Sequence, residues 1–430
     1  MIVFISDLHL VDETAGKHNI PAKAFEKFLD SIKIHSDNTK NEYKEVKIVF
    51  LGDIFDLLRT EEWFKEKEED RPWGKGTEKM RKRAQMILKK IAEKNKDTFN
   101  LFSKEVLKRK FKGVNIETIY IPGNHDRLCF MIDELKEKVI ELLGLNVSND
   151  ENFKHYFSDN EHGVYATHGH IFDEFNYEKK SKHNEEDYKL TPIGDPITTE
   201  IIAKLPYKLM NKLKEKSKLN KTEIEQVKRN FQDIENVRPL SATLKWLVYQ
   251  VKMNRKLKKI IEETINEIVK DFRKLEFVKN WYEQHDRGRL DIADKIQLIL
   301  KFLETFKVFR LNKFLKDADK IMKKIGTEST VKGAEELLPD LDKHIHYIVM
   351  GHTHSPKIEA LTLSTENHKP YEYVYLNTGT WRKSYYQCRD KSGFISWRNM
   401  TYVIFYTPEE KPNELKSPVF EIWQGAEMNN

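Results

Sequence analysis

The stretch IHYIVMGHTH, from Ile345 to His354, places an apolar run directly before two histidines, and the rest of the chain repeats this arrangement. A short run rich in β-branched and aromatic residues is typical of a strand buried in a sheet. Here the run ends at Met350, and Gly351-His352-Thr353-His354 follows at once. The stretch therefore predicts a strand that delivers two imidazoles to one edge of a sheet.

Four other short apolar runs, over residues 2–6, 46–51, 118–121 and 163–167, predict further strands. They are followed by Asp7-Leu8-His9, by Gly52-Asp53-Ile54-Phe55-Asp56, by Gly123-Asn124-His125-Asp126 and by His168-Gly169-His170. A helical period of apolar residues separates the first two runs. This strand, helix, strand order indicates an α/β fold with its polar residues at the carboxyl edge of the sheet.

The strand pattern stops in the middle of the chain. Between about Asp173 and Asp342 the sequence is dense in Lys, Glu, Leu and Ile, and apolar residues from Leu240 to Ile268 recur at the spacing of one long amphipathic helix. Strand-like runs resume afterwards. We therefore expect a core made of residues 1–172 and 343–430, interrupted by an all-helical insertion, or lid, over residues 173–342.

Composition limits the class of protein. A charged fraction of 33% and a hydrophobic fraction of 39% fit a protein with much exposed helical surface. The net charge is only +6 over 430 residues, which is weak support for nucleic-acid binding. The basic stretch from Lys245 to Lys259 can contact nucleic acid or an anionic membrane, but a solvated helix face packed on its neighbours is the favoured interpretation.

Compartment and membrane signals are few. Cys129 and Cys388 lie far apart without a C-x-x-C spacing, so neither a disulfide framework nor a thiolate zinc site is indicated. A reducing cytosol is the simplest compartment. No uncharged run approaches the roughly 18 residues that span a bilayer. We expect a cytoplasmic protein, with peripheral membrane contact left open.

The polar fragments together predict a two-metal centre. Each fragment alone also fits an ordinary turn after a strand, but five of them in this setting favour one site. Carboxylate, imidazole and amide donors without thiolate suit two divalent transition-metal ions, with manganese favoured over iron, zinc or nickel. Two such ions activate a bridging water and clamp a phosphoryl group for in-line displacement. Asp53 is the carboxylate that can bridge them.

The five fragments resemble the pattern of the calcineurin-like metallophosphoesterase superfamily, which is D-x-H, G-D-x-x-D, G-N-H-D/E, H and G-H-x-H. The resemblance implies a four-layer α/β/β/α sandwich. It implies one metal ion held by Asp7, His9, Asp53 and His354, and a second held by Asp53, Asn124, His168 and His352. It also implies that His125 faces the leaving-group oxygen, oriented by Asp126, and that Asp56 supports a ligand or the backbone at the strand end.

Two residues near His168 keep alternative roles. His170 either contacts the substrate or is structural. Asp173 either contacts the substrate or a metal ligand, or else is an ordinary carboxylate at the start of a helix.

Three further segments look like the branch of the superfamily that contains UDP-diacylglucosamine pyrophosphohydrolases. They are Tyr120–Asp126, Gly351–Pro356 and Tyr375–Trp381. Enzymes of that branch hydrolyse the pyrophosphate of a nucleotide-linked lipid and place a helical insertion over the metal site. The insertion expected here, near 170 residues, is longer than that branch implies, and the resemblance covers none of it.

The sequence thus predicts a metal-dependent phosphoesterase that hydrolyses a phosphodiester or pyrophosphate bond in a phosphorylated or nucleotide-containing substrate. A manganese-dependent nuclease and a protein phosphatase are alternatives, with nucleic acid not favoured as a partner. A non-catalytic scaffold that binds partners through the helical insertion is a third. The oligomeric state is left open.

Overall fold

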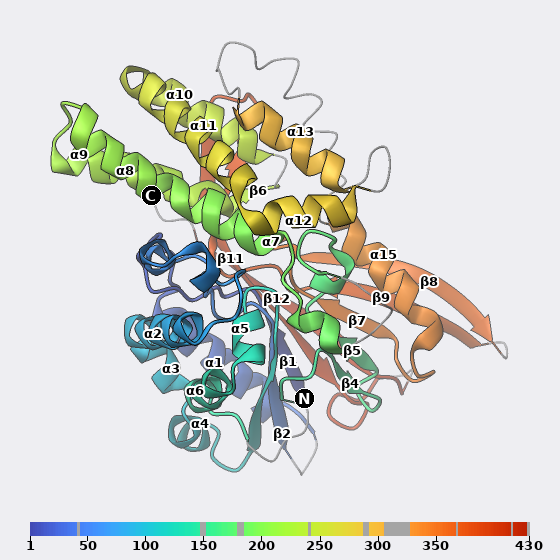
Figure 1. The fold of residues 1–430 in the computed structure, drawn as a ribbon. Helices are drawn as coiled ribbons and strands as arrows, with labels where there is room; N and C mark the ends of the chain where they lie inside the picture. Colours follow the sequence, from blue (N-terminus) through green and yellow to red (C-terminus); the bar gives the residue numbers. More distant parts are fainter. Residues whose placement is uncertain are drawn as a thin grey trace.

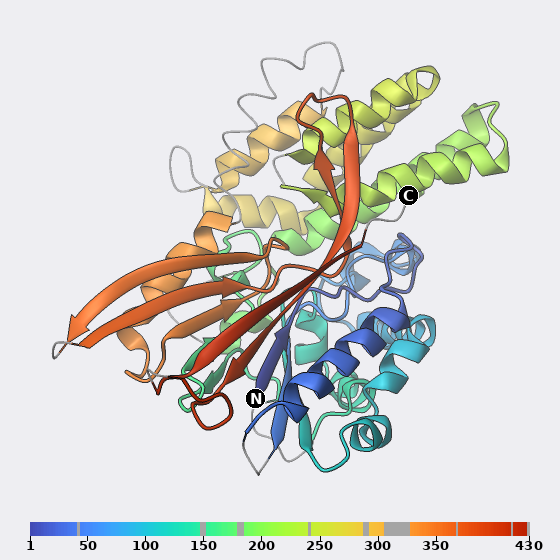
Figure 2. The same cartoon turned by 180° about the vertical axis from the view of Figure 1, so that it is seen from behind.

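A computed structural model describes residues 1–40, 44–146, 152–178, 185–239, 242–286, 292–304, 327–366, 369–413 and 416–427. Within them two β-sheets face one another, and helices pack on their outer sides (Figures 1 and 2). The chain is a mixed α/β protein, which confirms the fold class expected at that level.

The first sheet begins with three parallel strands, β1 (Ile2–Ile5), β2 (Glu45–Leu51) and β3 (Asn115–Ile121). On its other side β1 pairs antiparallel with β11 (Phe394–Tyr406). The sheet continues from β11 through β10 (Lys383–Gln387) to β6 (Val237–Arg238), and β12 (Val419–Glu427) also pairs with β11. Parallel pairing brings the carboxyl ends of β1, β2 and β3 to one edge.

The second sheet has the order β4 (Phe157–Asp159), β5 (Val164–Ala166), β7 (Tyr347–Met350), β9 (Lys369–Asn377) and β8 (Lys357–Glu366). Strands β5, β7 and β9 run parallel. The strand before His168 is therefore hydrogen-bonded to the strand before His352, although the whole helical segment separates the two in sequence.

Alternation along β1 explains how both faces of the first sheet are buried. Ile2 and Phe4 belong to the apolar layer between the sheets, together with Val349 and Leu376 of the second sheet. Val3 and Ile5 point the other way, into the layer beneath the outer helices. A strand buried on both faces reads as a continuous apolar run, which is why β1 was predictable.

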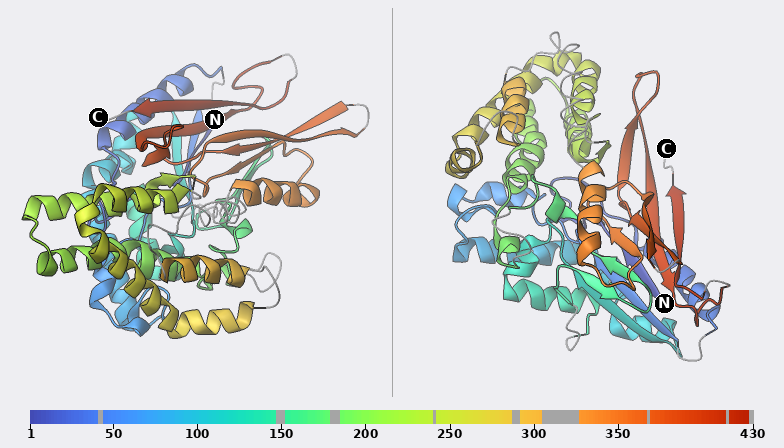
Figure 3. Two further views of the ribbon diagram at one scale, coloured as in Figure 1. Left: turned by 90° about the horizontal axis from the view of Figure 1, so that it is seen from above. Right: turned by 90° about the vertical axis from the view of Figure 1, so that its right-hand side faces the viewer.

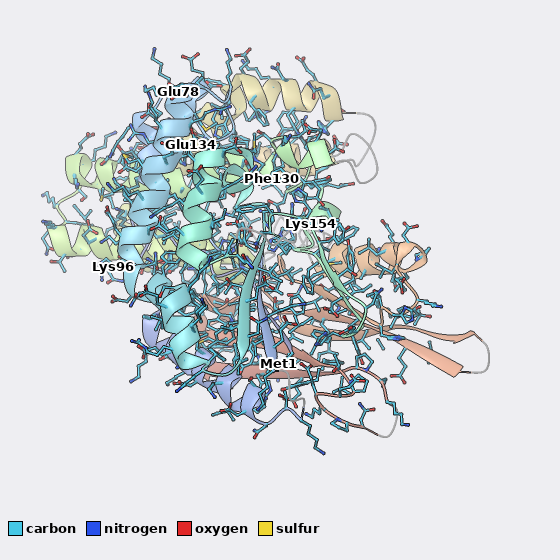
Figure 4. All side chains as sticks on the ribbon, turned by 90° about the horizontal axis from the view of Figure 1, so that it is seen from below. Met1, Glu78, Lys96, Phe130, Glu134 and Lys154 are labelled. Atoms are coloured by element: carbon cyan, nitrogen blue, oxygen red, sulfur yellow. The ribbon has the colours of Figure 1, made fainter. Side chains whose placement is uncertain are left out.

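Six helices of the described ranges cover the outer face of the first sheet. They are α1 (Ala22–Asp37), α2 (Glu78–Lys94), α3 (Lys96–Leu101), α4 (Lys104–Lys110), α5 (Arg127–Met131) and α6 (Asp133–Leu143). Figure 4 shows α2 and α6, which begin near the labelled Glu78 and Glu134, lying side by side. The 3-10 turns η1 (Glu61–Lys65) and η2 (Glu68–Asp70) connect β2 to α2.

A second apolar core lies within the helical segment that follows β5. Its helices include η4 (Glu185–Lys189), α7 (Gly194–Pro196), the π-helical η5 (Ile197–Ala203), α8 (Lys204–Lys216), α9 (Lys221–Gln232), α10 (Thr243–Met253), α11 (Lys258–Lys274), α12 (Glu276–His285) and α13 (Ile292–Glu304). Helices α8 to α13 surround a buried cluster that includes Phe231, Leu247, Ile268 and Leu300. In Figures 1 and 3 this helical unit lies beyond the carboxyl ends of β1 and β2.

The helical segment departs from the sequence prediction in three places. First, it is not all helical, because Val237 and Arg238 form β6 and pair with Tyr385 and Tyr386 of the first sheet. Second, the single long helix expected from Leu240 to Ile268 is broken. Helix α10 ends at Met253, where the amide of Asn254 donates to the Gln250 carbonyl at 2.7 Å, and α11 begins only at Lys258.

The third departure concerns α15 (Thr327–Leu337), which falls inside the expected insertion but packs on the second sheet. Its Val331, Ala334 and Leu337 share a buried cluster with Ile348 and Met350 of β7. Helices therefore pack on the outer faces of both sheets. Among the helices of the described ranges, none is long and apolar enough to cross a membrane.

Trp381 is the largest aromatic anchor between the first sheet and α1, and its loss should be costly. It is 1% exposed, and its ring stacks on Phe25 at a centroid distance of 5.2 Å. We expect Trp381→Ala to lower the free energy of unfolding by about 3–5 kcal/mol, measured by urea titration. Trp423→Ala is the matched control, since that side chain is 44% exposed, and equal losses in the two variants would contradict this assignment.

Candidate metal centre

Loops from five parallel strands meet at the edge shared by the two sheets. Asp7 and His9 follow β1, Asp53 and Asp56 follow β2, and Asn124 and His125 follow β3. His168 follows β5, and His352 and His354 follow β7. Three of these strands belong to the first sheet and two to the second, so the structure assembles the predicted residues from both sheets.

Glycines make this close approach feasible. A Cβ atom on Gly123 would lie 2.2 Å from Oδ1 of Asp53, and one on Gly351 would lie 2.4 Å from Oδ2 of Asp7. Both distances are far shorter than a carbon–oxygen contact permits. The glycine of the Gly-Asn-His-Asp fragment and that of the Gly-His-Thr-His fragment are therefore required by the packing of neighbouring loops around two carboxylates.

The backbone is strained at the predicted ligands. Asp7, His9, Asp53, His352 and His354 have φ values of 51°, 44°, 53°, 67° and 58°, in the left-handed region. That region costs a non-glycine residue about 1–2 kcal/mol. Backbone hydrogen bonds hold two of these loops together, from the Asp7 N–H to Gly52 O at 3.0 Å and from the His9 N–H to Asp53 O at 2.8 Å. Strain concentrated in this way is a feature of functional sites.

One cluster unites Asp7, His9, Asp53 and His354, whose ligand atoms lie within 4.8 Å of one another. The Nε2 atom of His9 lies 3.6 Å from Oδ2 of Asp53 and 3.8 Å from Oδ1 of Asp7. The Nε2 atom of His354 lies 3.3 Å from the same Asp7 oxygen. These are the four residues that the family resemblance implies for one metal ion.

A second cluster unites Asp53, His168 and His352, again within 4.8 Å. The Nε2 atom of His168 lies 3.2 Å from Oδ2 of Asp53. Asn124 lines the same cavity, and its Oδ1 is buried without a hydrogen-bond partner. These are the residues implied for the other metal ion. Asp53 belongs to both clusters.

Hydrogen bonds on the outer side of His168 and His352 determine which ring nitrogen of each faces the second cluster. Nδ1 of His168 donates to Leu51 O at 2.9 Å, so Nε2, which has no hydrogen-bond partner, is the nitrogen that offers a lone pair when the ring is neutral. Nε2 of His352 donates to Oδ2 of Asp173 at 2.8 Å. Metal-binding histidines are held in this way by a carboxylate or backbone carbonyl. The donor set therefore fits divalent cations.

Asp173 and Asn176 form a bracket behind the second cluster. Besides His352, Asp173 Oδ2 accepts from Nδ2 of Asn176 at 2.8 Å, and Oδ1 of Asn176 accepts from Nδ2 of Asn124 at 3.3 Å. Of the alternatives left open for Asp173, the structure favours contact with a predicted ligand. His170 is buried, and its ring lies against those of His168 and Tyr188, with centroid distances of 5.4 Å and 5.8 Å.

The prediction that Asp126 orients His125 is wrong. The Asp126 carboxylate accepts hydrogen bonds from the backbone N–H groups of Ile54, Phe55 and Gly123 at 2.9–3.2 Å, which use both oxygens. His125 instead donates from Nδ1 to Oδ1 of Asp56 at 3.0 Å. The other oxygen of Asp56 lies 3.4 Å from Nδ1 of His9. Asp56 therefore positions His125 and a predicted ligand together.

The buried carboxylates make the site electronegative. Burial disfavours the charged forms of Asp7 and Asp53, but the surrounding imidazoles, led by that of His168, together outweigh it and hold both pKa values below their usual range. Burial likewise opposes a charge on His125 and His168, yet Asp56 and Asp53 together raise the pKa of His125 to about 10, and Asp53 and Asp7 together raise that of His168 to about 9. Such a potential attracts cations, and a bound metal ion would displace the proton of His168.

Sequence reasoning missed Asn176, Glu235 and Arg238. Glu235 and Arg238 line the same cavity as His9 and His354, and Nη2 of Arg238 contacts Nδ1 of His354. All three residues come from the helical segment, where no motif marks them. Only the pairing of β6 with β10, which joins residues far apart in sequence, brings Arg238 to the site.

A cavity of about 420 Å³ extends from the metal centre into the helical unit. One end is formed by five of the predicted ligands together with His125, Asp173 and Asn176; the five are His9, Asp53, Asn124, His352 and His354. The remainder is lined mostly by aliphatic side chains of η5, α8, α10, α11 and α13, with Glu235 and Arg238 among its polar residues. The centre is thus the polar end of an otherwise apolar chamber.

Comparison with known families gives one match. The family model described as calcineurin-like phosphoesterase matches residues 1–224, which include the four fragments from Asp7 to His168. No curated protein sequence gives a match.

The bracket behind the second cluster should matter for metal binding. Asp173→Asn removes the charge opposite His352, and we expect manganese affinity at one of two sites to fall about 10–100-fold. Isothermal titration of metal-free protein with Mn²⁺ measures this. Asp390→Asn, at an exposed turn, is the matched control, and unchanged affinity in Asp173→Asn would show that His352 needs no carboxylate partner.

Proposed function

The chain belongs to the calcineurin-like phosphoesterase family, whose members are metal-dependent hydrolases of phosphoester bonds, and on this premise we propose that it hydrolyses a phosphodiester or pyrophosphate bond at a two-metal centre. The observation that carries the proposal is the position of Asp53. Its carboxylate is shared by two clusters of ligand atoms, which is the arrangement that a pair of metal ions requires.

Each side chain has a role in this scheme. Asp7, His9, Asp53 and His354 hold one ion, and Asp53, Asn124, His168 and His352 hold the other. The two ions, manganese in our proposal, supply an activated water and neutralise charge on the phosphoryl group. His125 lines the cavity and is kept protonated by Asp56, so it can donate a proton to the leaving-group oxygen.

The fold supports the same assignment. We infer that the two facing sheets and the helices on their outer sides form the four-layer α/β/β/α sandwich of the family. The helices from η4 to α13 are then an insertion between β5 and β7. The packing of α15 on β7 supports an end to the insertion before residue 327.

The chamber favours a substrate that carries an aliphatic group. Its wall includes Ile201 of η5, Leu205 of α8, Leu247 of α10, Ile268 of α11 and Leu300 of α13. Burying a methylene group stabilises a complex by about 0.8 kcal/mol, so an alkyl chain beside the scissile phosphate would add binding energy. We propose an amphiphilic phosphodiester or pyrophosphate, in keeping with the resemblance to the UDP-diacylglucosamine pyrophosphohydrolase branch.

The alternatives receive less support. A nuclease would need a basic surface that tracks the phosphates of DNA, whereas the described lining of the cavity is mostly aliphatic. In the basic stretch from Lys245 to Lys259, Trp246 and Val251 are buried in the helical core and Lys252 and Lys259 are exposed, as in a solvated helix face. A scaffold would not need the strained loops that gather the predicted ligands.

Asp53 provides the direct test. Asp53→Asn removes the shared carboxylate, and we expect kcat/KM for bis(p-nitrophenyl) phosphate to fall by more than about 100-fold. Mutating a residue that only hydrogen-bonds to a metal ligand already lowers activity or metal affinity about 10–100-fold. Metal content, measured by mass spectrometry, should fall from two ions per chain in the wild type. Asp390→Asn should retain both activity and metal. Undiminished hydrolysis by Asp53→Asn would falsify the proposal.

The chamber can be tested with a series of alkyl p-nitrophenyl phosphates. For the wild type we expect kcat/KM to rise with chain length from methyl to decyl, by up to about fourfold per methylene. In Ile268→Trp, which fills the chamber, the decyl to methyl ratio should drop at least about tenfold while hydrolysis of the methyl ester persists.

Met253→Trp is the control for that series, because Met253 is 66% exposed. This variant should keep the chain-length dependence of the wild type. A wild-type rate that is independent of chain length would show that the chamber does not receive the substrate.

A further inference from the structure

Arg238 is a buried guanidinium at the boundary between the metal centre and the apolar chamber. It is 5% exposed and lines the cavity. Its Nη1 donates to the carbonyls of Val237 at 2.9 Å and Glu235 at 2.7 Å, which fixes the plane of the group. Its Nε is buried without a hydrogen-bond partner. The side chain is therefore held in place by the backbone, with donor capacity unused.

No carboxylate lies within 4.0 Å of this guanidinium among the residues that the structure describes. The carboxylate of Glu235 contacts Nε of Arg59 and lies 3.9 Å from Nη1 of Arg382. The guanidinium of an arginine is effectively always protonated in a protein, so Arg238 carries a positive charge. A buried charge that no carboxylate contacts is costly, and a ligand anion would relieve that cost.

The contact between Arg238 and His354 also indicates that Arg238 has a donor available for a ligand. Nη2 of Arg238 contacts Nδ1 of His354, whereas Nε2 of His354 faces Asp7 and His9. When Nε2 of a neutral imidazole binds a metal ion, the ring proton lies on Nδ1. Two N–H groups cannot hydrogen-bond to each other. In the metal-bound protein Nη2 of Arg238 therefore requires another acceptor.

We propose that Arg238 binds a second phosphoryl group of the substrate, adjacent to the one held at the metal centre, and so selects pyrophosphates over single phosphodiesters. This inference rests on the proposed function. A guanidinium matches the oxygens of a phosphate in charge and geometry. A pyrophosphate carries its second phosphoryl group directly beside the first, as Arg238 lies directly beside the predicted ligand His354.

Arg59 and Arg382, the neighbouring buried arginines, do not share this role. Both lie within 3.9 Å of Oδ2 of Asp56, and both approach Glu235. They are paired within the protein, and the cavity lining includes neither. Arg238 is thus distinguished from them by its place on the cavity and by its lack of a carboxylate partner among the described residues.

The test measures anion binding by isothermal titration of manganese-loaded protein with imidodiphosphate, a non-hydrolysable pyrophosphate, and with inorganic phosphate. We expect Arg238→Gln to weaken imidodiphosphate binding at least tenfold and phosphate binding less than threefold. Arg238→Lys keeps the positive charge, so its affinity for imidodiphosphate should fall less than that of Arg238→Gln. Arg255→Gln, at an exposed arginine of the same helical unit, should bind both anions as the wild type does.

Three results would overturn the inference. Equal weakening of both anions would assign Arg238 to the phosphoryl group at the metals. Unchanged binding of both anions would show that Arg238 does not contact the bound anion. A loss of bound manganese, with anion binding recovered on reloading, would make it a positioning residue for His354. Thermal unfolding verifies that each variant is folded. If Arg238→Gln does not fold, the same titrations are made with Arg238→Lys.

The inference and the proposed function fail separately. A wild type that binds no manganese and hydrolyses no phosphodiester would refute the proposed function. Imidodiphosphate binding that depends on Arg238 would still be measurable in that metal-free protein. Conversely, an active wild type whose Arg238→Gln variant binds imidodiphosphate normally would refute only the inference.

Discussion

A charged carboxylate buried between two sheets is the constraint on which this structure depends. Asp53 is 1% exposed and stays ionised only because imidazoles surround it, with His168 at 3.2 Å and His9 at 3.6 Å. Those imidazoles come from different sheets, so their loops must meet at one edge. The parallel pairing of β1 with β2 and of β5 with β7 brings them there. The layer of apolar side chains between the sheets keeps the edge closed.

Local signals allowed much of the core and of the site to be predicted. Each strand that ends in a predicted ligand is a short apolar run followed by polar residues, so His168 and His352 were recognisable without knowledge of their pairing. The prediction failed where several groups compete for the same hydrogen-bond partner. Asp126 is the neighbour of His125 in sequence, but its carboxylate accepts hydrogen bonds from three backbone N–H groups and not from His125. Asn254 sits in an apolar helical pattern, yet its side chain bonds the backbone and ends α10. Arg238 had no signal, because a strand of two residues carries no periodicity.

The helical segment is part of the site and not only a cover for it. Asp173 and Asn176, at its start, contact His352 and Asn124, and Arg238 from β6 contacts His354. A buried ion pair also joins it to the core, with Oδ2 of Asp195 2.7 Å from Nη2 of Arg127 on α5. The apolar chamber is therefore fixed relative to the metal centre from several directions, which suits recognition of a substrate with a polar and an apolar end.

The left-handed backbone at Asp7, His9, Asp53, His352 and His354 places stability and function in opposition. At each of these positions glycine would adopt the same φ without the steric penalty, and five penalties of about 1 kcal/mol approach the entire stability of a small domain. Relief of this backbone strain is thus available only at positions whose side chains are the predicted ligands. Stabilising variants found by unguided screening should accumulate at this edge of the sheets, and they will be inactive.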